Sequence, residues 1–349
     1  MRLNENILEL LREKEAEAVK QTQRGAILQP GAIGDCILTL PLSRFMKQSL
    51  KLSEVDMVGN TEYIGILPGR TCIDRVRSIE SVDMHKLFIN AKEFDLAERD
   101  ALINFFADYS WIVTFLGEPD SDFEQNLIFT ANCSHSAEVI TVSAKPSKRF
   151  KGHISEFYIR QFMRQCGLSV RAGKSRLDEV LIRANESDID MARAQLKEAG
   201  IKASEKMVII QPGSGGRGKC WHVDNFLAVA KKLISDGLQV IFLLGPAELY
   251  RLDEARIRDM QAVAGCMTDL SLAEVLGLLS CADAFLGNDS GITHLAAGLG
   301  VKTVAVFGPS NPILYKPAGP AVTILCSDSP DFAERPYPAL QQQAVQALV

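Results

Sequence analysis

The second half of the chain alternates two patterns of hydrophobic and polar residues. Almost uninterrupted apolar runs occur at residues 207–211, 238–245, 284–288 and 302–308, and they predict strands that are buried on both faces. Apolar residues recur at helical spacing over residues 224–237, 271–283 and 292–300, which predicts amphipathic helices. Strands that alternate with helices in this way predict a parallel sheet covered by helices on both faces.

The first half shows the same alternation less cleanly, with strand-like segments at residues 55–59, 111–117 and 138–144. One short segment occurs in both halves. Residues 27–34 read Ile-Leu-Gln-Pro-Gly-Ala-Ile-Gly, and residues 209–216, which lie 182 positions later, read Ile-Ile-Gln-Pro-Gly-Ser-Gly-Gly. In each copy an apolar strand, a Pro-Gly turn and a glycine-containing loop precede a helix. The repeat predicts two similar α/β domains, each opening with the first βα unit of a doubly wound sheet.

These patterns divide the chain into four parts. We expect a helical extension over residues 1–24, an N-terminal Rossmann-like domain over 25–175 and a C-terminal Rossmann-like domain over 176–330. The last part, residues 331–349, is expected to be a helix that packs back toward the N-terminal domain. Residues 144–183 contain ten Lys and Arg but three acidic residues. This stretch is open to two interpretations, a solvated linker helix or a positive wall of an interdomain cleft that faces an anionic substrate.

Composition and charge then exclude several classes of protein. The 349 residues carry a net charge of −5, so we expect no nucleic-acid partner held by overall positive charge. No apolar run approaches the roughly 20 residues of a membrane-spanning helix. The N-terminal segment is charged and lacks the apolar core of a signal peptide. The eight cysteines form no Cys-x-x-Cys pair, which favours reduced thiols in a cytoplasmic protein.

The first candidate for chemistry is the loop Pro-Gly-Ala-Ile-Gly-Asp at residues 30–35. Its glycines are spaced G-x-x-G, so the G-x-G-x-x-G fingerprint of nicotinamide cofactors is missing. Asp35 lies where the loop becomes a helix, and two interpretations of it remain open. It could be an N-cap, or it could be a carboxylate at the carboxyl edge of the first strand, where open α/β sheets bind ligands.

Two further segments have the character of anion sites. The loop over residues 212–221 has four glycines in six residues, together with Ser214, Arg217 and Lys219, and such loops bind phosphates. Residues 287–294 place Asp-Ser-Gly between a strand and a helix N-terminus, which also favours anions. His294 follows Ser290 by one helical turn and is interpreted either as part of this site or as a structural histidine. Glu248 follows another strand and could accept hydrogen bonds from a ribose. His and carboxylate residues nowhere take metal-ligand spacing, so we expect no metal site.

Together these segments resemble glycosyltransferase family 9, the ADP-heptose:lipopolysaccharide heptosyltransferases. The resemblance extends from about residue 25 to about residue 320, and its most specific part is LGNDSGITHLAAGLGVKTVAVFGPSNP over residues 286–312. It implies a GT-B fold, in which two Rossmann-like domains with parallel sheets face each other across a cleft. Residues 25–175 would then be the acceptor domain and residues 176–330 the nucleotide-sugar donor domain. It also implies inverting transfer of a heptose from ADP-heptose to the lipid A–inner core sugars of lipopolysaccharide. No metal or organic cofactor is implied. The implied partners are an ADP-sugar donor and an anionic glycolipid acceptor, for a cytoplasmic protein whose membrane contact and oligomeric state stay open.

The resemblance also assigns roles to individual residues. Asp35 matches the family's proposed general base, and Glu248 matches the acid that reaches the ribose. The residues that match the donor-binding loop and turn are Ser214, Gly215, Lys219, Asp289, Ser290, Gly291 and His294. The chain departs from the family at His222, because many members have a proline there. Two alternatives to a heptosyltransferase remain: another GT-B transferase or epimerase that uses a different nucleotide sugar, and a non-catalytic module that binds a sugar nucleotide.

Overall fold

The computed structural model describes residues 23–168, 177–202, 205–327, 329 and 331–349. These residues form two compact units. The first comprises residues 23–31, 39–150 and 155–168, and the second comprises residues 32–38, 151–154 and the described residues from 177 onward. Most of the predicted N-terminal helix, residues 1–22, and the basic positions 171, 174 and 176 lie outside the described residues.

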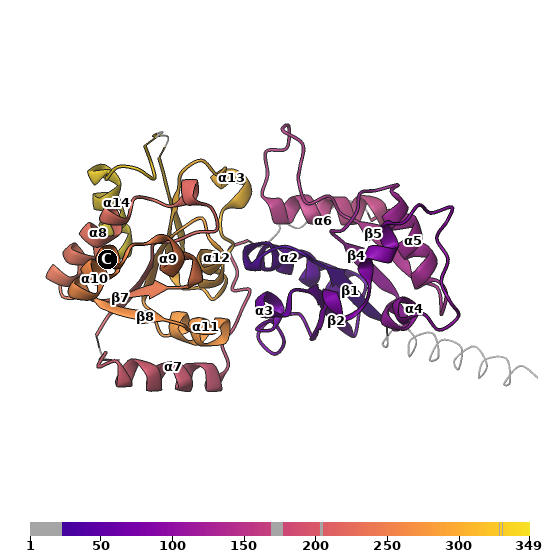
Figure 1. Ribbon diagram of the computed structural model, residues 1–349, viewed down its shortest axis with the longest axis horizontal. Helices are drawn as coiled ribbons and strands as arrows, with labels where there is room; N and C mark the ends of the chain where they lie inside the picture. The colour runs from indigo at the N-terminus through magenta and orange to yellow at the C-terminus, as the bar shows by residue number, and fades with distance from the viewer. Residues whose placement is uncertain (1–22, 169–176, 203–204, 328, 330) are drawn as a thin grey trace, which may run out of the picture. The chain divides into compact units, whose positions relative to one another are not determined.

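The first unit is built on a five-stranded sheet with the strand order β3-β2-β1-β4-β5 (Figure 1). Every neighbouring pair is parallel. Its strands are β1 (Arg24–Leu28), β2 (Glu54–Gly59), β3 (Arg75–Ser78), β4 (Trp111–Thr114) and β5 (Glu138–Thr141). Its helices are α2 (Ile33–Ser49), α3 (Thr61–Ile64), η1 (Ile79–Ser81), η2 (Met84–Phe88), α4 (Ala101–Phe106), α5 (Asp122–Ala131) and α6 (Ile154–Gln165). The start of α2 and the first residue of α6 are counted with the second unit.

The second unit has a six-stranded sheet with the order β11-β10-β9-β6-β7-β8, which is again parallel throughout. Its strands are β6 (Met207–Gln211), β7 (Gln239–Leu244), β8 (Gly265–Thr268), β9 (Ala284–Asn288), β10 (Lys302–Phe307) and β11 (Val322–Cys326). Its helices are α7 (Glu186–Glu198), η3 (Arg217–Lys219), α8 (Val223–Ser235), α9 (Pro246–Arg251), α10 (Glu254–Val263), α11 (Leu272–Ser280), α12 (Gly291–Gly298), α13 (Pro312–Tyr315) and α14 (Pro338–Leu348).

The predicted fold class of two parallel α/β units is confirmed. In each sheet the first strand of the unit lies beside the fourth, so the strand order reverses between β1 and β4 and again between β6 and β9. Every residue of β6 and of β9 is buried, as their uninterrupted apolar sequences predict. Helix α8 ends before Gly237, whose φ of +86° suits glycine at a helix C-terminus.

Two expectations about helices are corrected. The C-terminal helix was expected to pack toward the N-terminal domain, but α14 packs against α8 and the second sheet. The cause is its apolar stripe of Leu340, Ala344 and Leu348, which is buried in the core of the second unit. Of the two interpretations of the basic segment, the solvated linker helix does not hold for α6, because Tyr158 and Phe162 are buried in contact with aromatic side chains of the first unit.

Candidate functional site

The candidate site lies where the strand order of the second sheet reverses, beyond the carboxyl ends of β6 and β9. Open α/β sheets bind ligands at such points. A pocket of about 430 Å³ occurs there. All of its lining residues belong to the second unit. They are Ala32, Gly34, Asp35, Leu38, Ser214, Gly215, Gly216, Lys219, Asp289, Ser290, Gly291, His294 and Tyr315. The pocket therefore brings together every predicted site residue except Glu248.

The glycine-rich loop after β6 is held from two other elements of the second unit. Asn288, at the end of β9, is fully buried, and its Nδ2 donates to the carbonyl oxygen of Pro212 at 2.7 Å while its Oδ1 accepts the N–H of Trp221 at 2.8 Å. Arg251, at the end of α9, donates from its guanidinium to the carbonyl oxygens of Ser214 at 2.5 Å and Gly215 at 2.7 Å. With these carbonyl groups bound, the loop has a fixed path although four of its residues are glycine.

Asp289 is the charged centre of the pocket. Its Oδ2 accepts a hydrogen bond from Lys219 Nζ at 2.8 Å, and its Oδ1 lies 3.7 Å from Nε2 of His294. Burial alone would raise the pKa of the Asp289 carboxyl, but the interactions with His294 and Lys219 outweigh burial and hold that pKa well below its usual range. Asp289 is therefore ionised throughout the physiological pH range. Nearly half of the Lys219 side chain is exposed, and its ammonium group has three N–H donors, so it can bind a further acceptor.

The N-terminus of α12 forms one wall of the pocket. Ser290 is the N-cap, and its hydroxyl accepts the N–H of Thr293 at 3.3 Å and lies 3.0 Å from the Thr293 hydroxyl. At Gly291 a Cβ atom would come within 2.1 Å of Ile33 Cγ2, so a side chain does not fit there. Free N–H groups and the positive end of the helix dipole make such a terminus attractive to anions.

Glu248 is buried behind the glycine-rich loop and does not line the pocket. Its carboxylate accepts the N–H of Gly245 at 2.8 Å and the amide of Gln211 at 3.1 Å. The Gln211 oxygen in turn accepts the Ser290 hydroxyl at 2.9 Å. Burial raises the pKa of the Glu248 carboxyl, and the hydrogen bonds to it offset that effect only in part. The network connects the carboxyl ends of β6, β7 and β9.

Asp35 is the third residue of α2 rather than its N-cap, because the helix begins at Ile33. Its Oδ2 accepts the N–H of Ala32 at 3.1 Å, which is the contact that a carboxylate at the third helical position makes in a capping box. Asp35 also lines the pocket. The carboxylate thus has a structural hydrogen bond and a place beside the predicted anion site.

The structure shows how α8 begins at His222, the position at which the sequence departs from the family pattern. Where many members have proline, His222 is the N-cap of α8, and its Nδ1 accepts the N–H of Asp224 at 3.3 Å. Trp221 beside it is buried in the core of the second unit, where its ring contacts Phe226 at a centroid distance of 5.2 Å. The helix therefore begins normally without proline, and the indole ring anchors the end of the glycine-rich loop.

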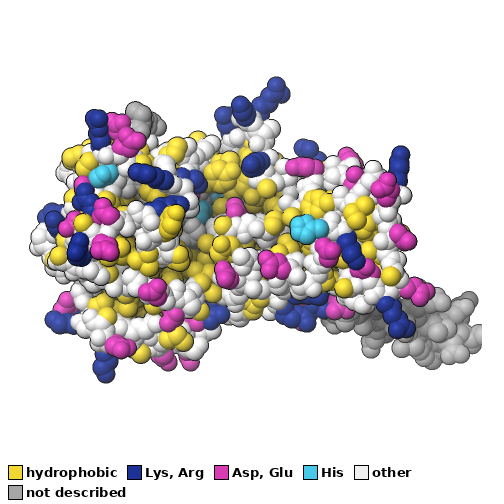
Figure 2. Space-filling view, in the orientation of Figure 1, with side chains coloured by type: hydrophobic (Ala, Val, Ile, Leu, Met, Phe, Trp, Pro, Cys, Tyr) yellow, Lys and Arg dark blue, Asp and Glu magenta, His cyan; other side chains and the backbone are white. Residues whose placement is uncertain are grey.

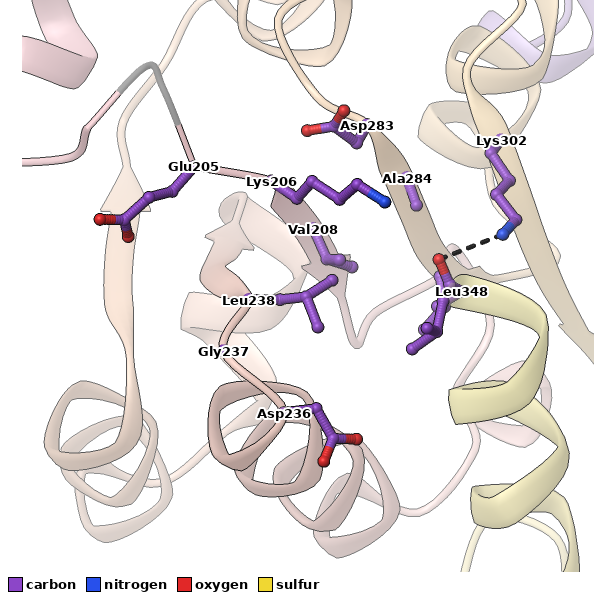
Figure 3. Close-up of a pocket in the computed structure, with 11 residues that line it drawn as sticks. Glu205, Lys206, Val208, Asp236, Gly237, Leu238, Asp283, Ala284, Lys302 and Leu348 are labelled. Carbon is purple, nitrogen blue, oxygen red and sulfur yellow. Dashed lines mark hydrogen bonds between the residues drawn. The ribbon is translucent and has the colours of Figure 1, made fainter.

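A second pocket lies at the opposite edge of the same sheet (Figure 3). It is next to the first residues of β6, β9 and β10, and Val208, Ala284 and Lys302 are among its lining residues. Lys302 Nζ donates to the carbonyl oxygen of Leu348 there at 3.2 Å. None of the predicted site residues lines this pocket. It is at the amino ends of the strands, so it lacks the loops and helix N-termini of the carboxyl edge.

Several residues of the site were not predicted from the sequence. They are Gln211, Arg251, Asn288, Thr293 and Tyr315. Gln211 carried a signal, because it belongs to the repeated Gln-Pro-Gly segment. Arg251 and Tyr315 carried none, since their roles depend on contacts between segments that are far apart in the chain. Within the described part of the chain, three or more His, Cys, Asp or Glu side chains nowhere cluster as they would around a metal ion, and no described helix is long and apolar enough to span a membrane.

The chain is similar in sequence to lipopolysaccharide heptosyltransferases. It is 24% identical over 307 residues to lipopolysaccharide heptosyltransferase 3 of Escherichia coli, an alignment that covers 81% of this chain and 83% of that protein. A shorter alignment with lipopolysaccharide heptosyltransferase 3 of Escherichia coli strain K12 is 30% identical over 128 residues. It covers 36% of this chain and 37% of that protein.

Solved structures share the fold. The glycosyl transferase family 9 protein from Veillonella parvula superposes with a TM-score of 0.69 at 19% identity, covering 93% of this chain and 95% of that one. The Escherichia coli heptosyltransferase WaaC with ADP superposes with a TM-score of 0.64 at 16% identity, covering 94% of this chain and 100% of that one. The family model described as glycosyltransferase family 9 (heptosyltransferase) matches residues 164–344, which is more than half of the chain. The chain therefore belongs to glycosyltransferase family 9, a family of heptosyl-transferring enzymes.

Proposed function

We propose that the protein transfers a heptose from ADP-heptose to the lipid A–inner core sugars of lipopolysaccharide, with inversion at the anomeric carbon. One observation carries the proposal. A single pocket of the second unit combines a glycine-rich loop, the Lys219–Asp289 ion pair and the N-terminus of α12. This combination suits the diphosphate of a nucleotide sugar. The family membership narrows the sugar to a heptose.

In this proposal the second unit binds the donor and stabilises its departing diphosphate. Lys219 donates to a phosphate oxygen with the N–H groups that Asp289 leaves unused, and the free N–H groups of α12 and the glycine-rich loop donate to the others. These groups are positioned before the reaction, so they stabilise the negative charge that develops as the bond to the sugar breaks. Ser214 is already tied to the pocket, because its hydroxyl donates to the Asp289 carbonyl at 2.6 Å. Glu248 is proposed to reach the ribose after releasing the Gln211 amide.

Asp35 is the proposed general base. The acceptor hydroxyl must lose its proton as its oxygen attacks the anomeric carbon, and the proton passes to the Asp35 carboxylate. A positioned carboxylate base contributes roughly 10²–10⁴-fold to such a reaction. Two features support the assignment: Asp35 lines the same pocket as Lys219 and His294, and it matches the family's proposed base.

The acceptor is proposed to be an anionic glycolipid, lipid A with its inner-core sugars, and the protein is proposed to act in the cytoplasm beside the membrane that holds this lipid. The similarity to lipopolysaccharide heptosyltransferases supports a lipopolysaccharide acceptor. In this scheme the protein reaches a lipid-borne acceptor at a bilayer surface, as a peripheral protein.

The nucleotide preference is tested by a thermal-shift panel of ADP, UDP, GDP and NAD. A ligand at a hundredfold its dissociation constant adds about 2.7 kcal/mol to the free energy of unfolding. That gain raises the melting midpoint of a domain of this size by a few degrees. We expect ADP to give the largest rise. Selective stabilisation by UDP, or no stabilisation by any nucleotide, would contradict the proposed donor.

A further inference from the structure

The loop between β5 and α6 has a strong local excess of positive charge. Residues 145–151 contain Lys145, Lys148, Arg149 and Lys151, and no acidic residue occurs between Glu138 and Glu156. All four basic side chains are exposed. Within the described part of the chain, none of the four forms an ion pair. This basic loop, residues 145–151, is exceptional in a chain whose net charge is −5.

The basic loop is anchored at both ends on α6. At its start the N–H of Ser143 donates to Gln161 Oε1 at 3.0 Å, and Gln161 Nε2 donates back to the Ser143 carbonyl at 3.1 Å. At its end the ring of Phe150 packs against Phe157 at 5.1 Å, and the Arg160 guanidinium lies 5.8 Å from the centre of the Phe150 ring. The two ends of the loop are therefore held on α6. Arg160 pairs with Glu156 at 3.7 Å, so the unpaired cations here are those of the loop itself.

The shape of the basic loop selects the kind of partner. Figure 1 shows the loop standing out beside α6, and Figure 2 shows Lys and Arg side chains gathered on this projection. Residues 145–150 of the loop belong to the first unit, and Lys151 is counted with the second. Its cations line neither the candidate site nor the pocket at the opposite edge of the second sheet. A small anion needs a concave site with converging donors. A projecting group of cations instead meets many anions at once on a flat, densely charged surface.

We infer that the basic loop docks the protein on an anionic lipid bilayer. Each Lys or Arg near such a bilayer contributes to binding within a Debye length of the surface, about 8–10 Å at physiological salt. The net negative charge of the whole chain gives no long-range attraction to polyanions, so binding depends on this local group. The inference rests on the proposed function in one respect, because an enzyme whose acceptor is a membrane lipid must bind at the membrane surface. Binding to lipid itself needs neither donor nor acceptor.

The test is sedimentation of the full chain with vesicles of phosphatidylethanolamine containing phosphatidylglycerol as a quarter of the lipid. We expect the wild type to bind these vesicles, to bind phosphatidylcholine vesicles weakly, and to be released by added salt. The variant Lys145→Gln/Lys148→Gln/Arg149→Gln should lose binding by roughly a hundredfold, since each cation near an anionic bilayer contributes about fivefold. These side chains are exposed and lie outside the core, so the variant should keep the wild-type melting temperature.

A matched control removes the same charge elsewhere. Lys197→Gln/Lys231→Gln/Arg258→Gln also replaces two lysines and one arginine that are exposed, and it should bind vesicles like the wild type. Equal losses in both triple variants, or no loss in either, would overturn the inference. The inference would also be overturned if the wild type bound a soluble polyphosphate as tightly as it binds vesicles, with both affinities expressed per phosphate group. The ADP-induced thermal shift is measured on the same samples. If the wild type shows the ADP-induced thermal shift but does not bind vesicles, only the docking surface is wrong. If the wild type binds vesicles but shows no ADP-induced shift, only the proposed function is contradicted.

Discussion

The two copies of the Gln-Pro-Gly repeat begin alike and end differently. In both, a buried glutamine ends or directly follows the central strand of a parallel sheet. Gln29 serves its own βα unit, because its Oε1 accepts the N–H of Gly31 and its Nε2 donates to Thr39 Oγ1. Gln211 instead connects three strand ends, through Glu248 after β7 and Ser290 after β9. The same local sequence thus stabilises one turn in the first unit and a whole pocket wall in the second.

Loop length explains the difference. Only residues 29–32 separate β1 from α2, whereas residues 212–222 separate β6 from α8. The short loop leads directly into a helix whose third residue is Asp35. The long loop exposes backbone N–H groups, but it needs Asn288 and Arg251 to hold its path. One copy is therefore suited to presenting a carboxylate, and the other to binding an anion. Single substitutions in either copy should therefore affect one of these two roles and leave the other intact.

The largest effect is expected for Asp35→Asn. Asparagine keeps an oxygen that can accept the Ala32 N–H, so the start of α2 should stay intact and the melting temperature should change little. Asparagine cannot accept a proton at neutral pH, so sugar transfer should slow by roughly a hundredfold or more. ADP affinity should stay near the wild-type value, because the proposed diphosphate ligands are untouched. Turnover and ADP affinity are measured on the same preparation.

Asp188→Asn is the matched control for Asp35→Asn. Asp188 is also the third residue of a helix, and its carboxylate accepts the N–H of Asn185 at 2.9 Å, but it does not line the pocket. Asparagine keeps the accepting oxygen here too, so we expect the melting temperature to change as little as in Asp35→Asn and the turnover to stay at the wild-type value. A stable Asp35→Asn protein that transfers sugar within a few-fold of the wild type would leave Asp35 with a structural role only.

Gly213→Ala should destabilise the second unit more than substitution of the other loop glycines. A Cβ at this position would lie 1.7 Å from Glu248 Oε1, so the buried carboxylate would have to move from its hydrogen bonds with Gly245 and Gln211. We expect a loss of about 2–3 kcal/mol in the free energy of unfolding. Gly215→Ala meets no atom within 4 Å and is the control. Equal stability of the two variants in urea unfolding would contradict the tight packing of Gly213 on Glu248.

Arg251→Ala removes the clamp on the carbonyl groups of Ser214 and Gly215. Hydrogen bonds from a charged donor contribute about 1.5–3 kcal/mol, and in an exposed loop we expect the lower end of this range, a weakening of ADP binding by roughly tenfold. The exposed Arg258→Ala in α10 is the control and should bind ADP normally. Calorimetry separates the two variants. If Arg251→Ala binds ADP like the wild type, the glycine-rich loop keeps its shape without the clamp.

The sequence predicted those parts of the fold that depend on local patterns. β6 and β9 were predicted over their exact ranges, because strands buried on both faces are apolar throughout. β3, β8 and β11 were missed, and all three are edge strands. β3 and β8 have four residues each with few apolar positions, whereas β11 is a short apolar run without a helical pattern before it to mark it as part of the alternation. The packing of α14 could not be predicted, because its apolar stripe alone does not say which unit it covers.

In the candidate site, too, the local motifs could be predicted from the sequence, whereas the contacts between distant segments could not. The glycine-rich loop and the Asp-Ser-Gly turn are recognisable because phosphate binding needs backbone N–H groups at consecutive positions. The parallel topology brings these two segments together, as strand alternation implies. The contacts that hold these two segments in place join residues that are far apart in the chain. Arg251 and Asn288 act on carbonyl groups of residues more than 30 positions away in the chain, and no spacing in the sequence marks such a pair.

The most direct test of the proposed donor site is calorimetric titration of ADP into the wild type, Lys219→Ala and Arg217→Ala. Both cations belong to the same loop, but Lys219 lines the pocket and pairs with Asp289, whereas Arg217 does neither. Loss of a charge-assisted hydrogen bond to the diphosphate should weaken ADP binding by roughly tenfold or more in Lys219→Ala. Arg217→Ala should stay within about twofold of the wild type, since an exposed charge outside the pocket contributes little. Equal affinities for all three proteins would contradict the account and would mean that the donor diphosphate binds elsewhere.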